Sequence, residues 1–267
     1  MTPDLMLLDH PARGVARITF NRPEKRNAMS REARRQLLQR FAELERGPSV
    51  IVITGSGPAF CAGVDLKELN ATDGSPLDDP FPWIAVQEVI RTCPAIVIAA
   101  VNGYALGGGV TLINSADLAI ADEQAQIGMP EVGFGLYPGL AGPSTQLRLA
   151  PKRSAWMVLT GDRISGLTAA DWGLVNAATT ADRLQDETLA LASRIAAYDP
   201  ETLRWCKRAL WQVPMHLSDW TAALEYGESV DTQIRARTDA VSQGLENFSA
   251  GGRSASQGAD AGRHGSD

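Results

Sequence analysis

The stretch that decides the fold is residues 99–131, AAVNGYALGGGVTLINSADLAIADEQAQIGMPE. It continues an apolar, β-branched run at 95–101, which predicts a buried strand. After an Asn-Gly turn, three consecutive glycines at 107–109 stand where a helix is expected to begin. Free N–H groups and the helix dipole make such a position a site for an anion. A second short strand, expected at 118–121, leads to Glu131. The stretch therefore predicts an oxyanion hole beside a proton-transfer group.

Composition and charge narrow the class of protein. The chain has 267 residues, 44% of them hydrophobic and 21% charged, which is typical of a globular protein of one large or two small domains. Its net charge of −6 favours neither nucleic acid nor an anionic membrane as partner. No apolar run approaches the roughly 18 residues of a membrane span, and the amino-terminal segment lacks the pattern of a signal peptide. We therefore expect a cytoplasmic protein with no nucleic-acid or membrane partner.

Cysteines and histidines argue against a metal site. The three cysteines are widely spaced, which indicates neither a disulfide framework nor a CxxC site and favours a reducing compartment. The three histidines are not at metal-ligand spacing. Only His216 remains as a base for a Ser-His-Asp triad. We therefore expect no metal-dependent or triad chemistry.

Hydrophobic periodicity predicts an α/β architecture followed by a helical region. Strands are expected at 5–9, 15–20, 50–54, 95–101 and 118–121, with one or two more near Ile164 and Val175. Ser30 is expected to cap a helix that runs to Arg46. Residues 132–144 are expected to form a loop. The remaining helices are expected at 83–91, 152–160, 168–173, 183–197, 199–211 and 218–247.

A second glycine-bearing loop, residues 55–67, leads into a short helix expected from Val64. This loop and the one that ends at Gly108 can each direct one backbone N–H at a single oxygen. Acyl-thioester chemistry requires such a pair, because proton abstraction beside the carbonyl places negative charge on that oxygen. The same glycines also serve tight turns and close helix–strand packing, so spacing alone leaves both interpretations open. The patterns of dinucleotide-binding loops, P-loops and nucleophile elbows are absent.

Five motifs, taken together and in this order, resemble the enoyl-CoA hydratase/isomerase (crotonase) superfamily. They are NRPEKRNA at 21–28, FCAGVDLK at 60–67, PAIVIAAVNGYALGGG at 94–109, MPE at 129–131 and LTGDRIS at 159–165. The resemblance covers about residues 5–250. It implies an α/β crotonase-like fold with a ββα spiral core at 1–197 and a helical oligomerisation region at 198–250. It also implies a homotrimer or hexamer. The low-complexity tail at 251–267 is expected to be disordered.

The same resemblance assigns roles to residues. It gives the two oxyanion-hole N–H groups to Val64 and Gly108, and it implies that Glu131 is a catalytic carboxylate. The path of the coenzyme A pantetheine would follow Val64, Asp65, Leu66 and Lys67. Coenzyme A would be part of the thioester substrate, so no separate cofactor is expected.

Other positions depart from the family pattern or extend it. The first of two hydratase glutamates is replaced by Thr111, and Gly139 is kept from a glycine-rich segment of the pocket wall. Tyr137 is interpreted either as a hydroxyl directed into the site or as core packing. Phe81 and Trp83 are candidates to face the acyl chain.

The replacement at position 111 decides which reaction is expected. A threonine hydroxyl can hydrogen-bond a water molecule but cannot act as its base near neutral pH. Moving a double bond from the 3- to the 2-position needs one base only, and Glu131 can serve in that role. We therefore expect single-glutamate, isomerase-like processing of an enoyl-CoA. The alternatives are hydration, hydrolysis or C–C cleavage of a β-keto acyl-CoA, and acyl-CoA binding without turnover. For Glu131 itself, the alternative is a helix-capping or surface carboxylate.

Overall fold

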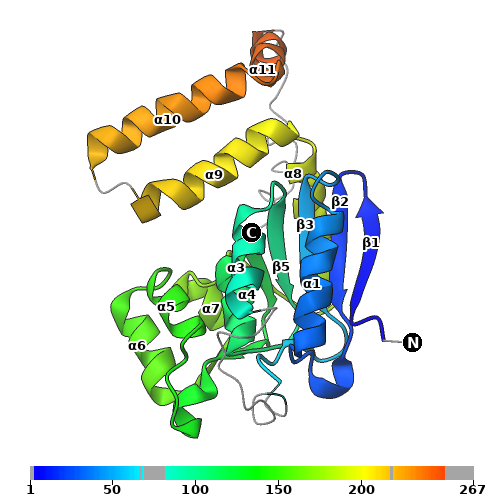
Figure 1. Ribbon diagram of the computed structural model, residues 1–267, viewed down its shortest axis with the longest axis vertical. Coiled ribbons are helices and arrows are strands. Elements are labelled where there is room, and N and C mark those ends of the chain that lie inside the picture. Colours follow the sequence, from blue (N-terminus) through cyan, green and yellow to red (C-terminus); the bar gives the residue numbers. More distant parts are fainter. Residues whose placement is uncertain (1–2, 66–67, 69–81, 217–218, 250–267) are drawn as a thin grey trace, which may run out of the picture.

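The larger of two sheets is built from the β-branched runs of the sequence. The computed structural model describes residues 3–65, 68, 82–216 and 219–249. In it, six strands lie in the order β1-β2-β3-β5-β7-β10 (Figure 1). β1 and β2 form an antiparallel pair, and every later pair is parallel. The strands are β1 (Met6–Ala12), β2 (Val15–Phe20), β3 (Val50–Gly55), β5 (Ile96–Val101), β7 (Leu118–Asp122) and β10 (Ala177–Thr179). The strand expected near Val175 thus begins two residues later.

A smaller sheet lies at the carboxyl ends of these strands and repeats their order. β4 (Ala59–Cys61), β6 (Tyr104–Leu106) and β8 (Gln126–Gly128) pair in parallel, and β9 (Arg163–Ser165) joins β8 antiparallel. Three times, a long strand of the first sheet is followed by a short strand of the second. This repetition is the ββα spiral expected from the sequence, and it brings the loops that follow β4, β6 and β8 to one edge.

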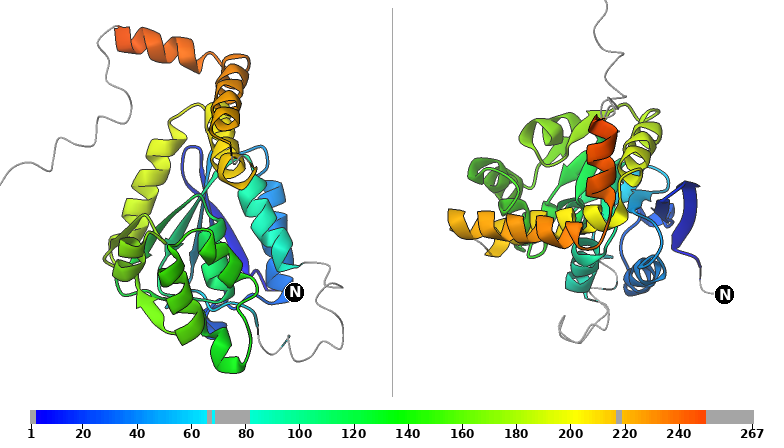
Figure 2. Two further views of the ribbon diagram at one scale, coloured as in Figure 1. Left: turned by 90° about the vertical axis from the view of Figure 1, so that its left-hand side faces the viewer. Right: turned by 90° about the horizontal axis from the view of Figure 1, so that it is seen from above.

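Successive side chains of the central strands point to opposite faces of the sheet, as strand geometry requires. Ile51 and Val97 pack on the face covered by α1 (Arg31–Glu43), α3 (Trp83–Thr92) and α4 (Gly108–Ser115). Val50 and Ile98 pack on the other face, against α8 (Leu184–Ala196). Figure 2 shows α8 across the sheet from α1 and α3. The sheet is therefore buried on both sides, which explains its near-continuous apolar strands.

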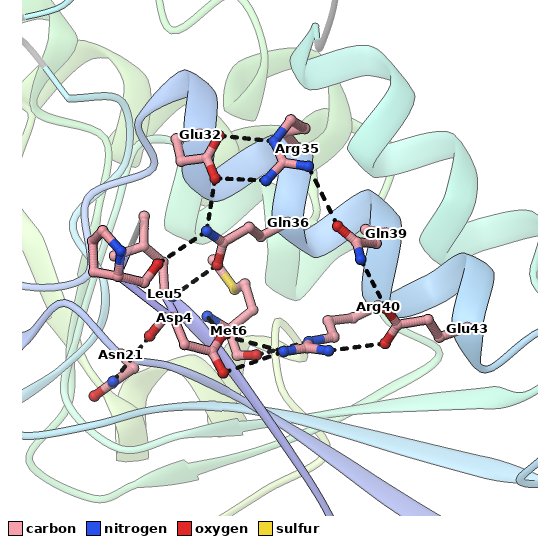
Figure 3. Close-up of polar contacts among 11 residues, drawn as sticks. Asp4, Leu5, Met6, Asn21, Glu32, Arg35, Gln36, Gln39, Arg40 and Glu43 are labelled. Atoms are coloured by element: carbon pink, nitrogen blue, oxygen red, sulfur yellow. Dashed lines mark hydrogen bonds and ion pairs between the residues drawn. The ribbon is translucent and has the colours of Figure 1, made fainter. Parts of the chain in front are cut away.

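Helix α1 begins as expected and fixes the start of the chain. Ser30 caps it, because its Oγ accepts from the Ala33 N–H at 3.1 Å. Gln36 accepts from the Leu5 N–H at 2.8 Å, and Arg40 donates to the Met6 carbonyl at 2.9 Å (Figure 3). The polar face of α1 thus holds β1 at the edge of the sheet. The helix ends at Glu43, three residues before the expected end.

Two expectations for the second half of the chain are wrong. The loop expected at 132–144 contains a 3-10 helix, η3 (Pro130–Phe134), and the start of α5 (Ala141–Gln146). The single helix expected at 218–247 is two, α10 (Trp220–Arg235) and α11 (Ala240–Ser249). The break has a local cause, because the Thr238 Oγ1 accepts from the Ala240 N–H at 3.2 Å and starts a new helix. The other helices lie close to their expected positions: α6 (Pro151–Thr160), α7 (Gly166–Trp172) and α9 (Pro200–His216).

Helices α10 and α11 project away from the two sheets, whereas α9 packs against the core (Figure 1). The expected boundary at 197 between a spiral core and a helical region stays a prediction. A buried cation joins α9 to the core: Lys207 Nζ lies 2.9 Å from Asp117 Oδ2 and donates to the Ile90 and Ala95 carbonyls, both at 2.8 Å. Trp211 Nε1 donates to the other oxygen of Asp117 at 2.9 Å. The role of these helices in oligomerisation stays a prediction.

Candidate functional site

The first loop of the site follows β4 and presents the N–H of Val64. Gly63 has a φ of +92°, which only glycine adopts without strain. Its carbonyl accepts from the Met29 N–H at 2.8 Å, and the Asp65 N–H donates to the Met29 carbonyl at 3.3 Å. These two bonds fix the peptide between Gly63 and Val64. Within the described part of the chain, the Val64 N–H has no acceptor.

The second loop follows β6 and ends at the first residue of α4. Gly107 has a φ of +51°, and its N–H donates to the Gly128 carbonyl at 2.9 Å. Its carbonyl accepts from Val110 and Thr111, which starts the helix at Gly108. The Gly108 N–H stands at the positive end of the helix dipole, and no described residue accepts from it.

The two loops touch, as the sequence predicted for a shared oxygen site. A Cβ on Gly63 would lie 2.7 Å from the Leu106 carbonyl oxygen and 3.1 Å from the Gly108 nitrogen. Conversely, a Cβ on Gly108 would lie 3.3 Å from the Gly63 Cα. This close approach, which we call the Gly63–Gly108 seam, brings the loop that carries the Val64 N–H against the residue that carries the Gly108 N–H. Two adjacent free donors can bind one oxygen that gains negative charge.

Glu131 projects from η3 toward the same glycines. A Cβ on Gly107 would lie 2.5 Å from Glu131 Oε1, so the carboxylate packs directly against the glycine that precedes Gly108. Glu131 Oε2 is buried and has no hydrogen-bond partner among the described residues. Burial raises the pKa of Glu131 above its ordinary value, and a hydrogen bond from its own backbone N–H opposes that rise only in part. The surface-carboxylate alternative does not fit a buried oxygen without a partner.

Thr111 lies inside α4, one turn beyond Gly107. It is fully buried, and its hydroxyl donates to the Gly107 carbonyl at 3.5 Å. Its side chain therefore leans back along its own helix, as threonine commonly does inside a helix. The position supplies no second carboxylate to the site.

The remaining candidates for substrate contact lie in different surroundings. Asp65 is buried and its Oδ2 forms an ion pair of 2.6 Å with Arg22. Gly139 is exposed in the turn before α5, where its N–H donates to the Tyr137 carbonyl at 2.8 Å. Leu66 and Lys67 lie outside the described residues, as do Phe81 and most of the short helix expected from Val64. The proposed contacts of Asp65, Leu66, Lys67 and Gly139 with a substrate stay predictions.

Two residues that support the site were not assigned a role from the sequence. Arg22 holds the Asp65 carboxylate, and Asn27, which is 2% exposed, donates from Nδ2 to the Ser56 and Ala59 carbonyls at 2.9 and 2.7 Å. Both belong to the NRPEKRNA motif at 21–28, so the motif itself was the available signal. Their bonds join this segment to the chain on either side of β4 and so position the first loop.

The core-packing interpretation of Tyr137 is wrong, and a hydroxyl directed into the site stays a prediction. The side chain is 56% exposed, so it is not core packing. Its hydroxyl accepts from Gln146 Nε2 at 3.1 Å and lies over Gly142 on α5. Trp83, in contrast, is 7% exposed and lies against Gly108, where a Cβ would meet its ring at 2.6 Å.

The described residues lack two other kinds of feature. No group of three histidine, cysteine, aspartate or glutamate side chains is placed to hold a metal ion. No helix in the described ranges is both long and apolar enough to cross a bilayer.

Comparisons with known proteins show which family the sequence resembles. The family model described as enoyl-CoA hydratase/isomerase matches residues 11–249. The hydroxycinnamoyl-CoA hydratase-lyase of Pseudomonas fluorescens is 35% identical, covering 73% of this chain and 74% of that protein. The mevalonyl-coenzyme A hydratase of Aspergillus fumigatus is 32% identical, covering 86% and 90%.

Solved structures of proteins from the same family have the same fold as this chain. The crystal structure of an enoyl-CoA hydratase from Mycobacterium smegmatis superposes with a TM-score of 0.88 at 29% identity, covering 94% of this chain and 98% of that one. The predicted crotonase-like fold is thereby confirmed. The chain belongs to the enoyl-CoA hydratase/isomerase family of acyl-CoA-processing enzymes.

Proposed function

We propose that this enzyme is an enoyl-CoA isomerase in which Glu131 is the only proton-transfer group. One observation carries the proposal: among the described residues, Glu131 is the one carboxylate at the site with a buried, unpaired oxygen, while position 111 holds a threonine bonded to its own helix. Glu131 takes a proton from C2 of a 3-enoyl thioester, and the electron pair of that C–H bond delocalises toward the thioester oxygen. The same proton then returns to C4, so that the double bond moves to the 2-position with no net gain or loss of atoms.

The Val64 and Gly108 N–H groups stabilise the intermediate of this reaction. The thioester oxygen becomes an enolate oxygen, and both donors lie at the Gly63–Gly108 seam. In acyl-transfer enzymes one such donor contributes roughly 2.7–4 kcal/mol to the barrier reduction. The raised pKa of Glu131 serves the same step, because a base works best when its pKa is close to the working pH.

The proposed binding of the substrate rests on the family resemblance. Coenzyme A then runs along the first loop, with Val64, Asp65, Leu66 and Lys67 beside the pantetheine and Gly139 in the wall of the acyl pocket. Coenzyme A enters and leaves as part of the substrate. The active form is a homotrimer or hexamer. The relatives named above differ in their acyl groups, hydroxycinnamoyl and mevalonyl, so family membership selects no acyl group for this chain.

Hydration is the second candidate, because both relatives carry hydratase in their names. One experiment separates the two reactions. The protein is incubated with a 3-enoyl-CoA and, separately, with a 2-enoyl-CoA, and the absorbance of the conjugated thioester is followed. An isomerase produces conjugation from the first substrate, whereas a hydratase removes it from the second.

Two variants test the residues. Glu131→Gln is expected to lower isomerisation by roughly 10²- to 10⁴-fold, the usual contribution of a positioned base. Thr111→Val, which keeps the volume and removes the hydroxyl, is expected to retain isomerisation within a few-fold. Rapid hydration of 2-enoyl-CoA that Thr111→Val abolishes would refute the single-base mechanism. Full activity of Glu131→Gln would remove Glu131 from catalysis.

A further inference from the structure

Trp83 carries a buried polar group that the proposed reaction does not use. The residue opens α3, and its side chain is 7% exposed. Its Nε1 has no hydrogen-bond partner among the described residues. Buried tryptophans usually find an acceptor for this N–H, since leaving a buried donor unpaired is unfavourable. The unpaired N–H therefore needs an explanation.

The indole places the atom that carries this N–H on the side of the ring that lies against the site. Cζ2 and Cη2 of Trp83 both lie 2.6 Å from the position that a Cβ would take on Gly108, and Gly63 Cα lies 3.3 Å from that same position. In an indole ring, Nε1, Cζ2 and Cη2 occupy one edge, and Nε1 and Cζ2 share a bonded neighbour. The edge that contacts the Gly63–Gly108 seam is therefore the edge that carries the N–H.

A second unpaired group belongs to a residue that contacts the same run of glycines. Glu131 Oε2 is buried without a partner, and the Glu131 carboxylate packs against Gly107. One free donor and one free acceptor thus lie beside the residues that present the oxyanion-hole N–H of Gly108. Glu131 has a use in proton transfer at carbons 2 and 4 of the acyl group. The N–H of Trp83 has none in a substrate whose acyl group is a plain hydrocarbon.

We propose that Trp83 is a specificity-determining residue whose Nε1–H donates to a neutral oxygen substituent on the acyl group. This inference rests on the proposed function, since it takes the seam as the thioester site. The substituent is a hydroxyl, ketone or ether oxygen a few bonds from the thioester. A carboxylate fits less well, because it would share a water-poor site with the Glu131 carboxylate and like charges repel there. The preferred substrates are therefore oxygenated acyl-CoA thioesters.

Binding measurements test this without requiring turnover. Saturated acyl-CoA thioesters of one chain length are compared by calorimetry, one unsubstituted and the others with a keto or hydroxyl oxygen at successive positions from C4. The wild type is expected to bind at least one oxygenated thioester roughly 10- to 100-fold more tightly than the unsubstituted one. Trp83→Phe, which keeps an aromatic ring and removes the N–H, is expected to abolish that preference.

Matched controls separate hydrogen bonding from packing. Trp156→Phe changes a tryptophan that is 54% exposed on α6 and is expected to leave the preference unchanged. Benzothienylalanine at position 83 keeps the ring shape and replaces only the N–H by sulfur, so it is expected to behave like Trp83→Phe.

The outcomes distinguish this inference from the proposed function. Equal affinity of the wild type for all the thioesters, or an equal loss for all of them in Trp83→Phe, would overturn the role of Trp83. The second result is also what a contact with the pantetheine chain or a purely structural tryptophan would give. Isomerisation of 3-enoyl-CoA by the same preparation is measured separately. Its absence alongside an intact oxygen preference would reject the isomerase proposal and leave the role of Trp83 standing.

Discussion

Replacing Gly107 by alanine should reduce catalysis far more than it reduces stability. The new Cβ would stand 2.5 Å from Glu131 Oε1, whereas ordinary contacts of this kind begin near 3.4 Å, so the carboxylate must withdraw by about 1 Å. A displacement of about 1 Å at a reacting group can cost roughly 10²-fold in rate. We therefore expect Gly107→Ala to lower kcat for isomerisation by about 10²-fold, with KM changed much less.

The backbone contributes a separate effect that a control can remove. Gly107 has a φ of +51° and a ψ of −108°, a combination that residues with a Cβ rarely adopt, so alanine there costs about 1–3 kcal/mol of stability. Gly173 has a φ of +81°, and no atom lies within 4 Å of the position of its Cβ. Gly173 lies in the left-handed helical region, so Gly173→Ala carries a milder backbone strain of about 1–2 kcal/mol without touching the site.

The assay compares both variants with the wild type. Kinetics with a 3-enoyl-CoA give kcat and KM, and denaturant unfolding gives the free energy of unfolding. The expected pattern is a loss of stability in both variants, no smaller in Gly107→Ala than in Gly173→Ala, and a loss of kcat in Gly107→Ala alone. Wild-type kcat in a folded Gly107→Ala protein would refute the idea that this glycine sets the position of the carboxylate. An equal loss of kcat in Gly173→Ala would do the same.

Two further predictions concern pH and the buried ion pair. The pKa of Glu131 in the folded protein is raised above the ordinary value of 4.5, so between these two values the folded state binds more protons than the unfolded state and stability falls as pH rises. Glu131→Gln is therefore expected to be more stable than the wild type above the raised pKa, and the difference should vanish below pH 4.5. The wild-type kcat/KM should fall as the pH is lowered, with a midpoint above 4.5. A Glu131→Gln protein that is less stable than the wild type at neutral pH would contradict this. Lys207→Met should lower the free energy of unfolding by about 3–5 kcal/mol, because it leaves Asp117 buried without its cation. A change below about 1 kcal/mol in urea unfolding would show that the pair contributes little.

Local patterns predicted the parts of the fold that depend on neighbouring residues. The cap at Ser30, the apolar runs of β3 and β5 and the glycine start of α4 all follow from short-range chemistry, and the structure has each of them. The helix expected at 218–247 failed because the periodicity continues through Thr238, whose capping bond interrupts it. Patterns of hydrophobicity do not register one hydroxyl that competes for a backbone N–H.

Contacts between distant residues were the part that the sequence could not supply. Asp65 and Arg22 are 43 positions apart, and Trp83 reaches Gly108 from a different helix. Core packing was one of two interpretations of Tyr137, yet its side chain lies on the surface over α5. The motifs indicated that Arg22, Asp65 and Gly108 belong to one site, but only the folded spiral decides which residues meet.

The register between β6 and β8 is the feature that couples the two halves of the site. Leu106 pairs with Gly128, and the Gly107 N–H donates to the Gly128 carbonyl. Gly128 precedes Glu131 by three residues, so this pairing sets the carboxylate against Gly107 at the same time as Gly107 starts the helix that frees the Gly108 N–H. A slip of one residue would move Glu131 by about 3.3 Å and turn the paired side chains to the opposite face. The oxyanion hole and the base therefore depend on one strand pairing, and a change that shifts this register is expected to disable both together.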